Sequence, residues 1–237
     1  MKTKLDTRVT EEPTRIDVKD IFESVDLSGV TAGTWTTFVR LAGCNLRCCW
    51  CETPYALTAV QGETMDIAAV LEAVQTDNVT VTGGEPLAQG EASMRLIREL
   101  MTTHLVNLET NGSMDFRPLL RDKFAPHLRV TMDWKLPSSK MEEYMNPELL
   151  KALRARDVLK LVCGSERDLD RAEVVIKEMQ RVSHAKCYIT TVFGKLHPRD
   201  VVDRMRIWSE EHELDMTRIR LQLQMRSIIW GQEQRVI

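Results

Sequence analysis

Three cysteines in the first quarter of the chain have a spacing that suits metal chemistry. Cys44, Cys48 and Cys51 are separated by three residues and then by two, so one loop can point three thiolates at the same group. A [4Fe-4S] cluster usually takes four cysteines, and a three-cysteine loop leaves one iron open to an outside ligand. The sequence therefore predicts a [4Fe-4S] cluster with one exchangeable site.

A zinc site is the main alternative for this loop. Structural zinc requires a closed set of four ligands, and neither a second cysteine pair nor a nearby histidine follows the loop. Cys49 could replace Cys48, but it would break the spacing and should point away from its neighbour, so we interpret it as a bystander. Cys163 and Cys187 lie in apolar strand contexts, which are typical of buried thiols that pack as small hydrophobic groups.

The rest of the chain alternates short apolar runs with amphipathic stretches, a pattern typical of βα units around a mostly parallel sheet. Helices are predicted over residues 65–75, 91–103, 167–181 and 199–212. Strands are predicted over residues 35–41, 79–82, 106–109, 129–133, 158–162 and 187–192, and residues 219–230 begin as a strand. The predicted fold class is therefore α/β.

Length and composition limit the class of protein. The 237 residues, 43% of them hydrophobic, suffice for one sizeable core, so we expect one domain over residues 1–237, with the polar residues 1–20 loosely ordered. The 35 acidic and 32 basic side chains nearly balance, which favours a small soluble substrate over nucleic acid or a membrane surface. No apolar run approaches the roughly 18 residues of a membrane-spanning helix. The first 20 residues also lack the apolar core of a signal peptide, so we expect a cytoplasmic protein.

Polar motifs follow four successive predicted strands. In a sheet of parallel strands the loops after the strands converge at one edge, where active sites form. The motifs CNLRCCWC, GGEP, TNGS and DWKLPSS begin at residues 44, 83, 110 and 133. We therefore expect all four to contribute to a single site.

The cysteine loop resembles the CxxxCxxC motif of the radical S-adenosylmethionine superfamily, including the aromatic Trp50 before its last cysteine. The GGEP string matches the GGE motif of that superfamily. The resemblance implies a partial TIM-like barrel, reduced to about six strands, in which S-adenosylmethionine fills the open iron site. It also implies that Trp50 lies near the adenine and that reduction of the cluster yields methionine and a 5′-deoxyadenosyl radical.

Side chains in the other motifs suit such a cofactor. Gly83 and Gly84 would let a ligand approach the backbone, and the carboxylate of Glu85 can accept from the methionine ammonium group. Read alone, GGEP and TNGS would be common turns, and the acid and base of DWK a surface ion pair. At successive strand ends, the expected contacts of the ribose and carboxylate are Thr110, Asn111, Asp133 and Lys135.

A narrower resemblance appears when FVRLAGCNLRCCWCETPYA, VTGGEPL, LETNGS and DWKLPSS are read together in this order. They look like the 7-carboxy-7-deazaguanine synthase family, over residues 21–230. The resemblance implies conversion of 6-carboxy-5,6,7,8-tetrahydropterin to 7-carboxy-7-deazaguanine with loss of ammonia, on the route to queuosine and other deazapurines. It further implies magnesium, a homodimer, and an electron donor such as flavodoxin or ferredoxin.

The same resemblance implies roles for individual residues. Thr53 matches a position whose hydroxyl contacts magnesium, although threonine before a proline also often bonds its own backbone. Arg40 matches a substrate-contacting arginine, its alternative being a strand-end arginine in water, and Thr82 matches another substrate contact. No catalytic side chain is assigned, because S-adenosylmethionine carries the radical.

Two segments depart from the family pattern. The family's QGEG segment, which touches the pterin, is replaced by DLSG at residues 26–29, so that Asp26 stands at a substrate-binding position. Near the end, Arg226 and Ser227 replace a frequent HK pair. Two other hypotheses therefore stay open: an activating or peptide-modifying radical enzyme, and a non-catalytic regulatory protein on the same fold.

The ligand assignment makes a direct prediction. Alanine at Cys44, Cys48 or Cys51 should each abolish the charge-transfer absorbance of the reconstituted cluster, because each removes one iron ligand. Cys49→Ala should leave it largely intact. Cluster loss in Cys49→Ala together with retention in Cys48→Ala would overturn the assignment.

Overall fold

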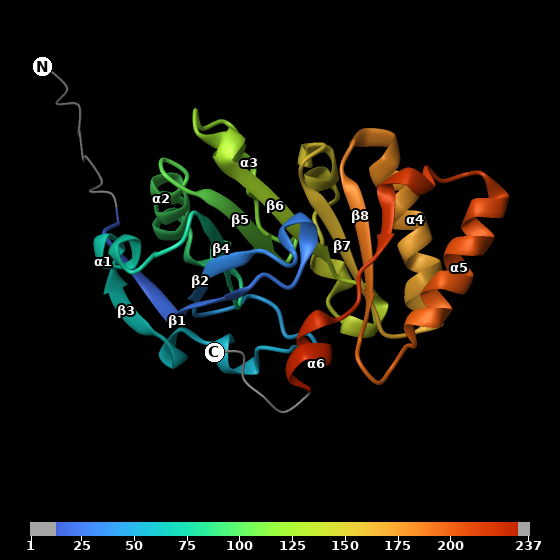
Figure 1. Cartoon of the computed structure of the whole chain (residues 1–237), viewed down its shortest axis with the longest axis horizontal. Coiled ribbons are helices and arrows are strands. Elements are labelled where there is room, and N and C mark those ends of the chain that lie inside the picture. Colours follow the sequence, from blue (N-terminus) through green and yellow to red (C-terminus); the bar gives the residue numbers. More distant parts are fainter. Residues whose placement is uncertain (1–12, 232–237) are drawn as a thin grey trace, which may run out of the picture.

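The strands form one curved sheet that does not close on itself (Figure 1). The computed structural model describes residues 13–231, and in this part of the chain nine strands pair in the order β3-β1-β2-β4-β5-β6-β7-β8-β9. β1 is antiparallel to β2 and β3, and all pairs from β2 to β9 are parallel. The strands are β1 Arg15–Val25, β2 Trp35–Leu41, β3 Glu63–Asp66, β4 Asn78–Gly83, β5 Leu105–Thr110, β6 Leu128–Trp134, β7 Val158–Cys163, β8 Lys186–Thr191 and β9 Ile219–Leu221.

The six predicted strands are confirmed as β2, β4, β5, β6, β7 and β8, each to within one residue at either end. The strand-like start of residues 219–230 is β9. The expected strand number is nevertheless wrong, because β1 and β3 also belong to the sheet. Residues 15–20, expected to be loosely ordered, form half of β1, in which Ile16 and Val18 are buried between polar neighbours. The remaining part of that expectation, residues 1–12, lies outside the described residues.

The helices lie on the outer side of the sheet. The four predicted helices are confirmed as α1 Ile67–Glu72, α2 Glu91–Leu100, α4 Glu166–Val182 and α5 Pro198–Glu211, with α1 and α2 shorter than expected. Two short helices, α3 Arg117–Leu120 and α6 Met225–Trp230, are additional. Figure 1 shows α4 and α5 beside β7 and β8 at one end of the sheet and α1 and α2 at the other. None of the described helices is long and apolar enough to cross a membrane.

Alternation along the strands gives the sheet two chemically different faces. In β4, Val79 and Val81 are fully buried in the hydrophobic core under the helices. Thr80 and Thr82 point to the inner side, where each donates a hydrogen bond to a carboxylate. The inner face is therefore polar and buried, and it can hold a polar ligand.

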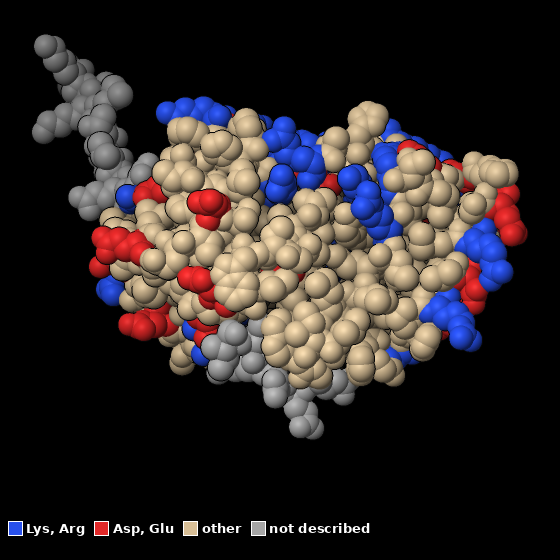
Figure 2. All heavy atoms as spheres, in the orientation of Figure 1, with Lys and Arg blue, Asp and Glu red and all other residues tan. Residues whose placement is uncertain are grey.

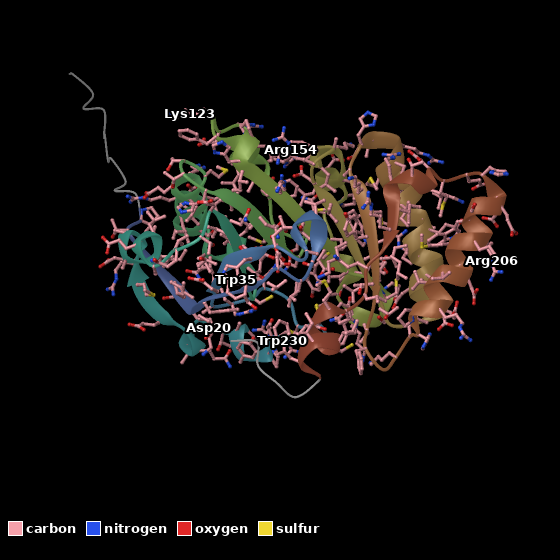
Figure 3. All side chains as sticks on the ribbon, viewed as in Figure 1. Asp20, Trp35, Lys123, Arg154, Arg206 and Trp230 are labelled. Atoms are coloured by element: carbon pink, nitrogen blue, oxygen red, sulfur yellow. The ribbon has the colours of Figure 1, made fainter. Side chains whose placement is uncertain are left out.

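The surface carries charges of both signs. Figure 2 shows acidic and basic side chains around the rim of one face and a mostly uncharged centre. Basic side chains gather along the upper edge of that view, where Figure 3 labels Lys123 and Arg154. This spread agrees with the near balance of 35 acidic and 32 basic residues in the sequence.

A buried ion pair joins the beginnings of two central strands. Asp157, fully buried before β7, accepts from the backbone N–H of Val130 at 2.9 Å and from Nε of Arg154 at 2.8 Å. The same guanidinium group donates to the carbonyl of Leu128 at 2.8 Å. Arg154 and Trp230 lie at opposite edges of the molecule in Figure 3, so this pair stabilises the end of the sheet away from α6.

We expect Asp157→Ala to lower the free energy of unfolding by about 3–5 kcal/mol, because it leaves a half-buried guanidinium group and backbone donors without their acceptor. Asp203→Ala is the matched control, since Asp203 is exposed and pairs with an exposed Arg206. It should cost less than about 1 kcal/mol. Urea denaturation followed by circular dichroism measures both, and equal losses would contradict this role of Asp157.

Candidate functional site

A cavity of about 240 Å³ lies at the carboxyl ends of the parallel strands. The four predicted motifs all reach it. Every residue predicted for the cluster, the cofactor, the metal or the substrate lines this cavity: Asp26, Arg40, Cys44, Cys48, Trp50, Cys51, Thr53, Thr82, Gly83, Gly84, Glu85, Thr110, Asn111, Asp133 and Lys135. The structure thus brings together all of these residues, whose roles we propose below.

The three spaced cysteines form one wall of the cavity, and Cys49 does not. Cys44, Cys48 and Cys51 are half-buried, whereas Cys49 is exposed and its thiol donates to the carbonyl of Ser138 at 2.9 Å. Within residues 13–231 no three Cys, His, Asp or Glu side chains are grouped closely enough to hold a single metal ion. Cys44, Cys48 and Cys51 line the cavity, and Cys49 does not.

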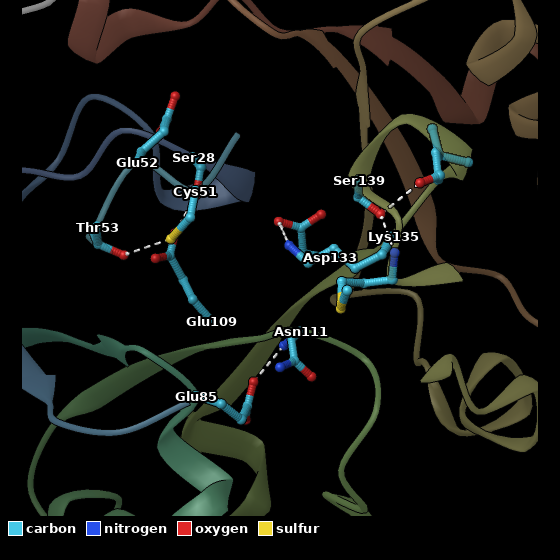
Figure 4. A network of polar contacts seen from close by, with 12 residues as sticks. Ser28, Cys51, Glu52, Thr53, Glu85, Glu109, Asn111, Asp133, Lys135 and Ser139 are labelled. Carbon is cyan, nitrogen blue, oxygen red and sulfur yellow. Dashed lines mark hydrogen bonds and ion pairs between the residues drawn. The ribbon is translucent and has the colours of Figure 1, made fainter. Parts of the chain in front are cut away.

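Hydrogen-bond donors approach the sulfur atoms of this wall. The Sγ of Cys44 accepts from the backbone N–H of Leu46 at 3.4 Å and faces Nδ2 of Asn111 at 3.9 Å. The Thr53 hydroxyl lies 3.8 Å from the Sγ of Cys51 (Figure 4). The two donors to Cys44 favour the thiolate form that iron ligation requires.

The GGEP glycines serve the protein backbone first. A Cβ on Gly83 would lie 2.1 Å from the carbonyl oxygen of Leu41, and one on Gly84 would lie 2.2 Å from that of Gly43. Gly84 also donates its N–H to Leu41 at 3.1 Å. The glycines, predicted to admit a ligand, are therefore required because this loop packs directly on the base of the cysteine loop.

Glu85 is hydrogen-bonded to two neighbouring segments of the protein. Its fully buried carboxylate accepts from the N–H groups of Leu87 at 3.1 Å and Asn111 at 2.6 Å and from the Thr110 hydroxyl at 2.8 Å (Figure 4). Burial raises the pKa of this carboxyl group, and these hydrogen bonds partly offset the rise. A buried carboxylate must be satisfied by donors. Glu85 therefore ties GGEP to TNGS, and its contact with a ligand ammonium group stays a prediction.

Lys135 and its neighbours form the wall beside the cysteines. Its Nζ donates to Oδ2 of Asp133 at 2.9 Å and lies 5.4 Å from the ring centroid of Trp50. The indole N–H of Trp50 donates to the hydroxyl of Ser138 at 3.2 Å, which fixes the ring. Oδ1 of Asp133 is buried without a hydrogen-bond partner among the described residues, as expected if a ligand supplies a donor there.

The opposite wall combines a cation with a carboxylate. The guanidinium group of Arg40 lies between the rings of Phe22 and Tyr55, at 5.5 and 5.8 Å from their centroids. Its buried Nε lies 3.7 Å from Oδ2 of Asp20 as an ion pair and has no hydrogen-bond partner among the described residues. Next to it in register, Thr82 donates to Glu109 at 2.7 Å. An anionic ligand group can therefore approach Arg40, and a donor-rich one can approach Glu109.

Asp26 also lines the cavity, and protein donors hydrogen-bond to its carboxylate oxygens. Its carboxylate accepts from the hydroxyls of Thr31 at 2.7 Å and Thr80 at 2.8 Å and from the N–H of Ser28 at 3.2 Å. Burial and the charge of Glu109 raise its pKa. Asp26 thus holds the loop in which Ser28 donates to Glu109.

Sequence reasoning missed several residues of the cavity. Glu109 stands directly before TNGS in an inward strand position, and Lys160 has the same position in β7, so strand alternation could have found both. Glu52 and Gln224 also line the cavity and are hydrogen-bonded to each other. No sequence signal indicates that contact, because it joins segments 172 residues apart.

Comparisons with known proteins agree with these observations. A family model described as a 4Fe-4S single cluster domain matches residues 29–151. A 7-carboxy-7-deazaguanine synthase from Clostridium acetobutylicum is 35% identical over 223 residues, which cover 92% of this chain and 97% of the relative. Another, from Leptospira interrogans, is 30% identical and covers 94% of this chain and 98% of its own.

Solved structures share the fold. A crystal structure of QueE from Escherichia coli superposes with a TM-score of 0.63 at 16% identity, covering 89% of this chain and 94% of its own. SuiB from Streptococcus suis, bound to the precursor peptide SuiA, gives 0.54 at 11% identity over 76% of this chain and 46% of its own. At these identities the likeness supports the open α/β barrel alone. The sequence relatives go further, because they match nearly the whole chain, and they show that it belongs to the 7-carboxy-7-deazaguanine synthase family.

Proposed function

We propose that the chain is a radical S-adenosylmethionine lyase that converts 6-carboxy-5,6,7,8-tetrahydropterin to 7-carboxy-7-deazaguanine with release of ammonia. The observation that carries the proposal is one cavity with three thiols on one wall and Arg40 beside Glu109 on another. When bound, the cluster and S-adenosylmethionine supply the one-electron chemistry that removes a hydrogen atom from the substrate. The remaining requirements concern how the chain holds that substrate.

The charges of the opposite wall complement a carboxylated pterin. The pterin ring has an edge of N–H donors, which suits the carboxylate of Glu109, held by Ser28 and Thr82. The carboxylate of the substrate suits Arg40, whose Nε has a 3.7 Å ion pair with Asp20 but no hydrogen-bond acceptor among the described residues. Two anchors at separate points fix the orientation of a planar ring, and such orientation is what a reactive radical requires.

Solvent must be kept from the reaction, and the end of the chain contributes to this. Gln224, just before α6, donates to Glu52 in the cysteine loop. This contact joins the segment after β9 to the cysteine loop, and both residues line the cavity. We propose that it narrows the mouth around the bound substrate, because water or a mobile substrate would divert the radical.

Thr53 supports a magnesium site. Its side chain makes no capping hydrogen bond to the turn that begins at Pro54, contrary to the alternative suggested by the sequence. Its hydroxyl lies at the cavity wall, 3.8 Å from the Sγ of Cys51, and its oxygen keeps lone pairs that a metal can use. Magnesium keeps several waters and binds through few protein oxygens together with the substrate. We therefore propose that Thr53 holds magnesium against the carboxylate of the pterin.

Two partners belong to the proposal. Reduction of the cluster requires a low-potential electron donor of the flavodoxin or ferredoxin class. The open sheet leaves β3 and β9 as edges, and exposed edges are commonly covered by another chain. We propose a homodimer, and light scattering at micromolar concentration that gave a monomer would count against it.

An anaerobic assay with 6-carboxytetrahydropterin, S-adenosylmethionine, reductant and magnesium tests the function. Deazaguanine product is the expected result. Deoxyadenosine without that product would indicate an activating or peptide-modifying radical enzyme. Neither product, from protein with a full cluster, would indicate a non-catalytic regulator.

Thr53→Val should raise the magnesium concentration needed for half-maximal turnover and weaken pterin binding, because it replaces the proposed metal ligand with a methyl group. Cluster content and S-adenosylmethionine affinity should stay near those of the wild type. Thr58→Val is a matched control in the following turn, outside the cavity. An unaltered magnesium response in Thr53→Val would contradict the metal role.

A further inference from the structure

A buried ammonium group lies beside the cysteine wall. Lys135 follows β6 and is 8% exposed, although lysine is almost never buried without a partner. Its Nζ is held by Oδ2 of Asp133 at 2.9 Å and by the face of Trp50 at 5.4 Å. Figure 4 shows Lys135 and Asp133 extending toward each other next to the loop of Ser139. The charge is therefore fixed in place.

The segment after this lysine is hydrogen-bonded to the cysteine loop. The backbone N–H of Cys49 donates to the carbonyl of Ser139 at 3.3 Å, and its thiol donates to the carbonyl of Ser138 at 2.9 Å. The indole N–H of Trp50 donates to the Ser138 hydroxyl at 3.2 Å. Lys135 lines the same cavity as the three thiols of the cysteine wall. A buried cation therefore lies in the cavity that the proposed cluster ligands line.

We propose that Lys135 is a positioning residue that sets the reduction potential of the cluster, in addition to any contact with S-adenosylmethionine. A [4Fe-4S] cube held by three thiolates is already anionic, and its reduction adds one more electron. A fixed cation stabilises the reduced state more than the oxidised state, and it does so strongly in a site with little water. One electron from a low-potential flavin or iron–sulfur donor enters the cluster, and no bond at Lys135 is made or broken.

Asp133 limits the effect of the lysine. Its Oδ2 is paired with Lys135, and its Oδ1 is buried without a partner among the described residues. The carboxylate lines the same cavity as the cysteines, so its negative charge subtracts from the field of Lys135 there. The inference predicts that removing either charge shifts the potential, in opposite directions.

The test is a potentiometric titration of the reconstituted cluster, followed by electron paramagnetic resonance, without substrate and with or without S-adenosylmethionine. Lys135→Met should move the midpoint potential to a more negative value even without S-adenosylmethionine, whereas Lys135→Arg should stay near the wild type. Asp133→Asn should move it to a more positive value. Lys140→Met is the control, because Lys140 is an exposed lysine in the same loop, and it should cause no shift.

An unchanged potential in Lys135→Met, with altered S-adenosylmethionine affinity alone, would overturn the proposal. Should Lys135→Met fail to hold a cluster, the sign of the shift in Asp133→Asn decides, and no positive shift there would overturn it as well. The inference rests on the proposed cluster but not on the pterin, since the titration contains none. Shifts of the expected signs in a protein that makes no deazaguanine would therefore contradict the substrate assignment alone.

Discussion

The close contact between two backbone loops is the constraint on which the rest of the site depends. The GGEP loop packs so tightly on the base of the cysteine loop that any side chain at Gly84 would overlap the carbonyls of Gly43 and Ala56. The N–H of Glu85 donates to Gly43 at 2.8 Å, and its buried carboxylate then reaches TNGS. Three successive strand ends are thereby fixed relative to the three thiols.

The sheet can offer such a site because strand alternation divides its residues by chemistry. Val79, Val81 and their counterparts form a continuous core under the helices, which supplies the stability. The inward residues near the carboxyl ends of the strands therefore do not have to pack in this hydrophobic core. Threonines, acids and lysines occupy them, and their hydrogen bonds to one another replace the water lost on burial.

Local patterns in the sequence predicted most of the architecture. The six strands were found to within a residue, because short runs that place apolar residues on at least one face are typical of strands. β1 was missed because most of its residues are only partly buried and polar residues interrupt its apolar ones. β3 contains no fully buried side chain, so its sequence has no apolar pattern that indicates a strand. It is a strand because it pairs with β1.

The sequence predicted which residues belong to the candidate site better than it predicted the role of each residue. Spacing and strand ends brought Cys44, Asp133 and the others to one cavity, since topology alone makes those loops converge. The roles of Glu85 and Asp26 depend on which donors surround each carboxylate, and those donors come from distant strands. No local sequence pattern indicates which distant donors will hydrogen-bond to a given carboxylate.

The charged groups of the cavity are of two kinds. Some have hydrogen bonds from the protein on their oxygens, and others keep an atom without a hydrogen-bond partner among the described residues. Glu85 and Asp26 have their oxygens occupied by the protein and act as structural ties. Arg40 and Asp133 each keep one buried polar atom without a hydrogen-bond partner among the described residues, although Nε of Arg40 lies 3.7 Å from Asp20. Such atoms are costly unless a ligand satisfies them. One lies by the Glu109 wall and the other by the cysteine wall. The cavity therefore has two separate positions where ligand binding relieves a cost, as a site for a cofactor and a substrate side by side requires.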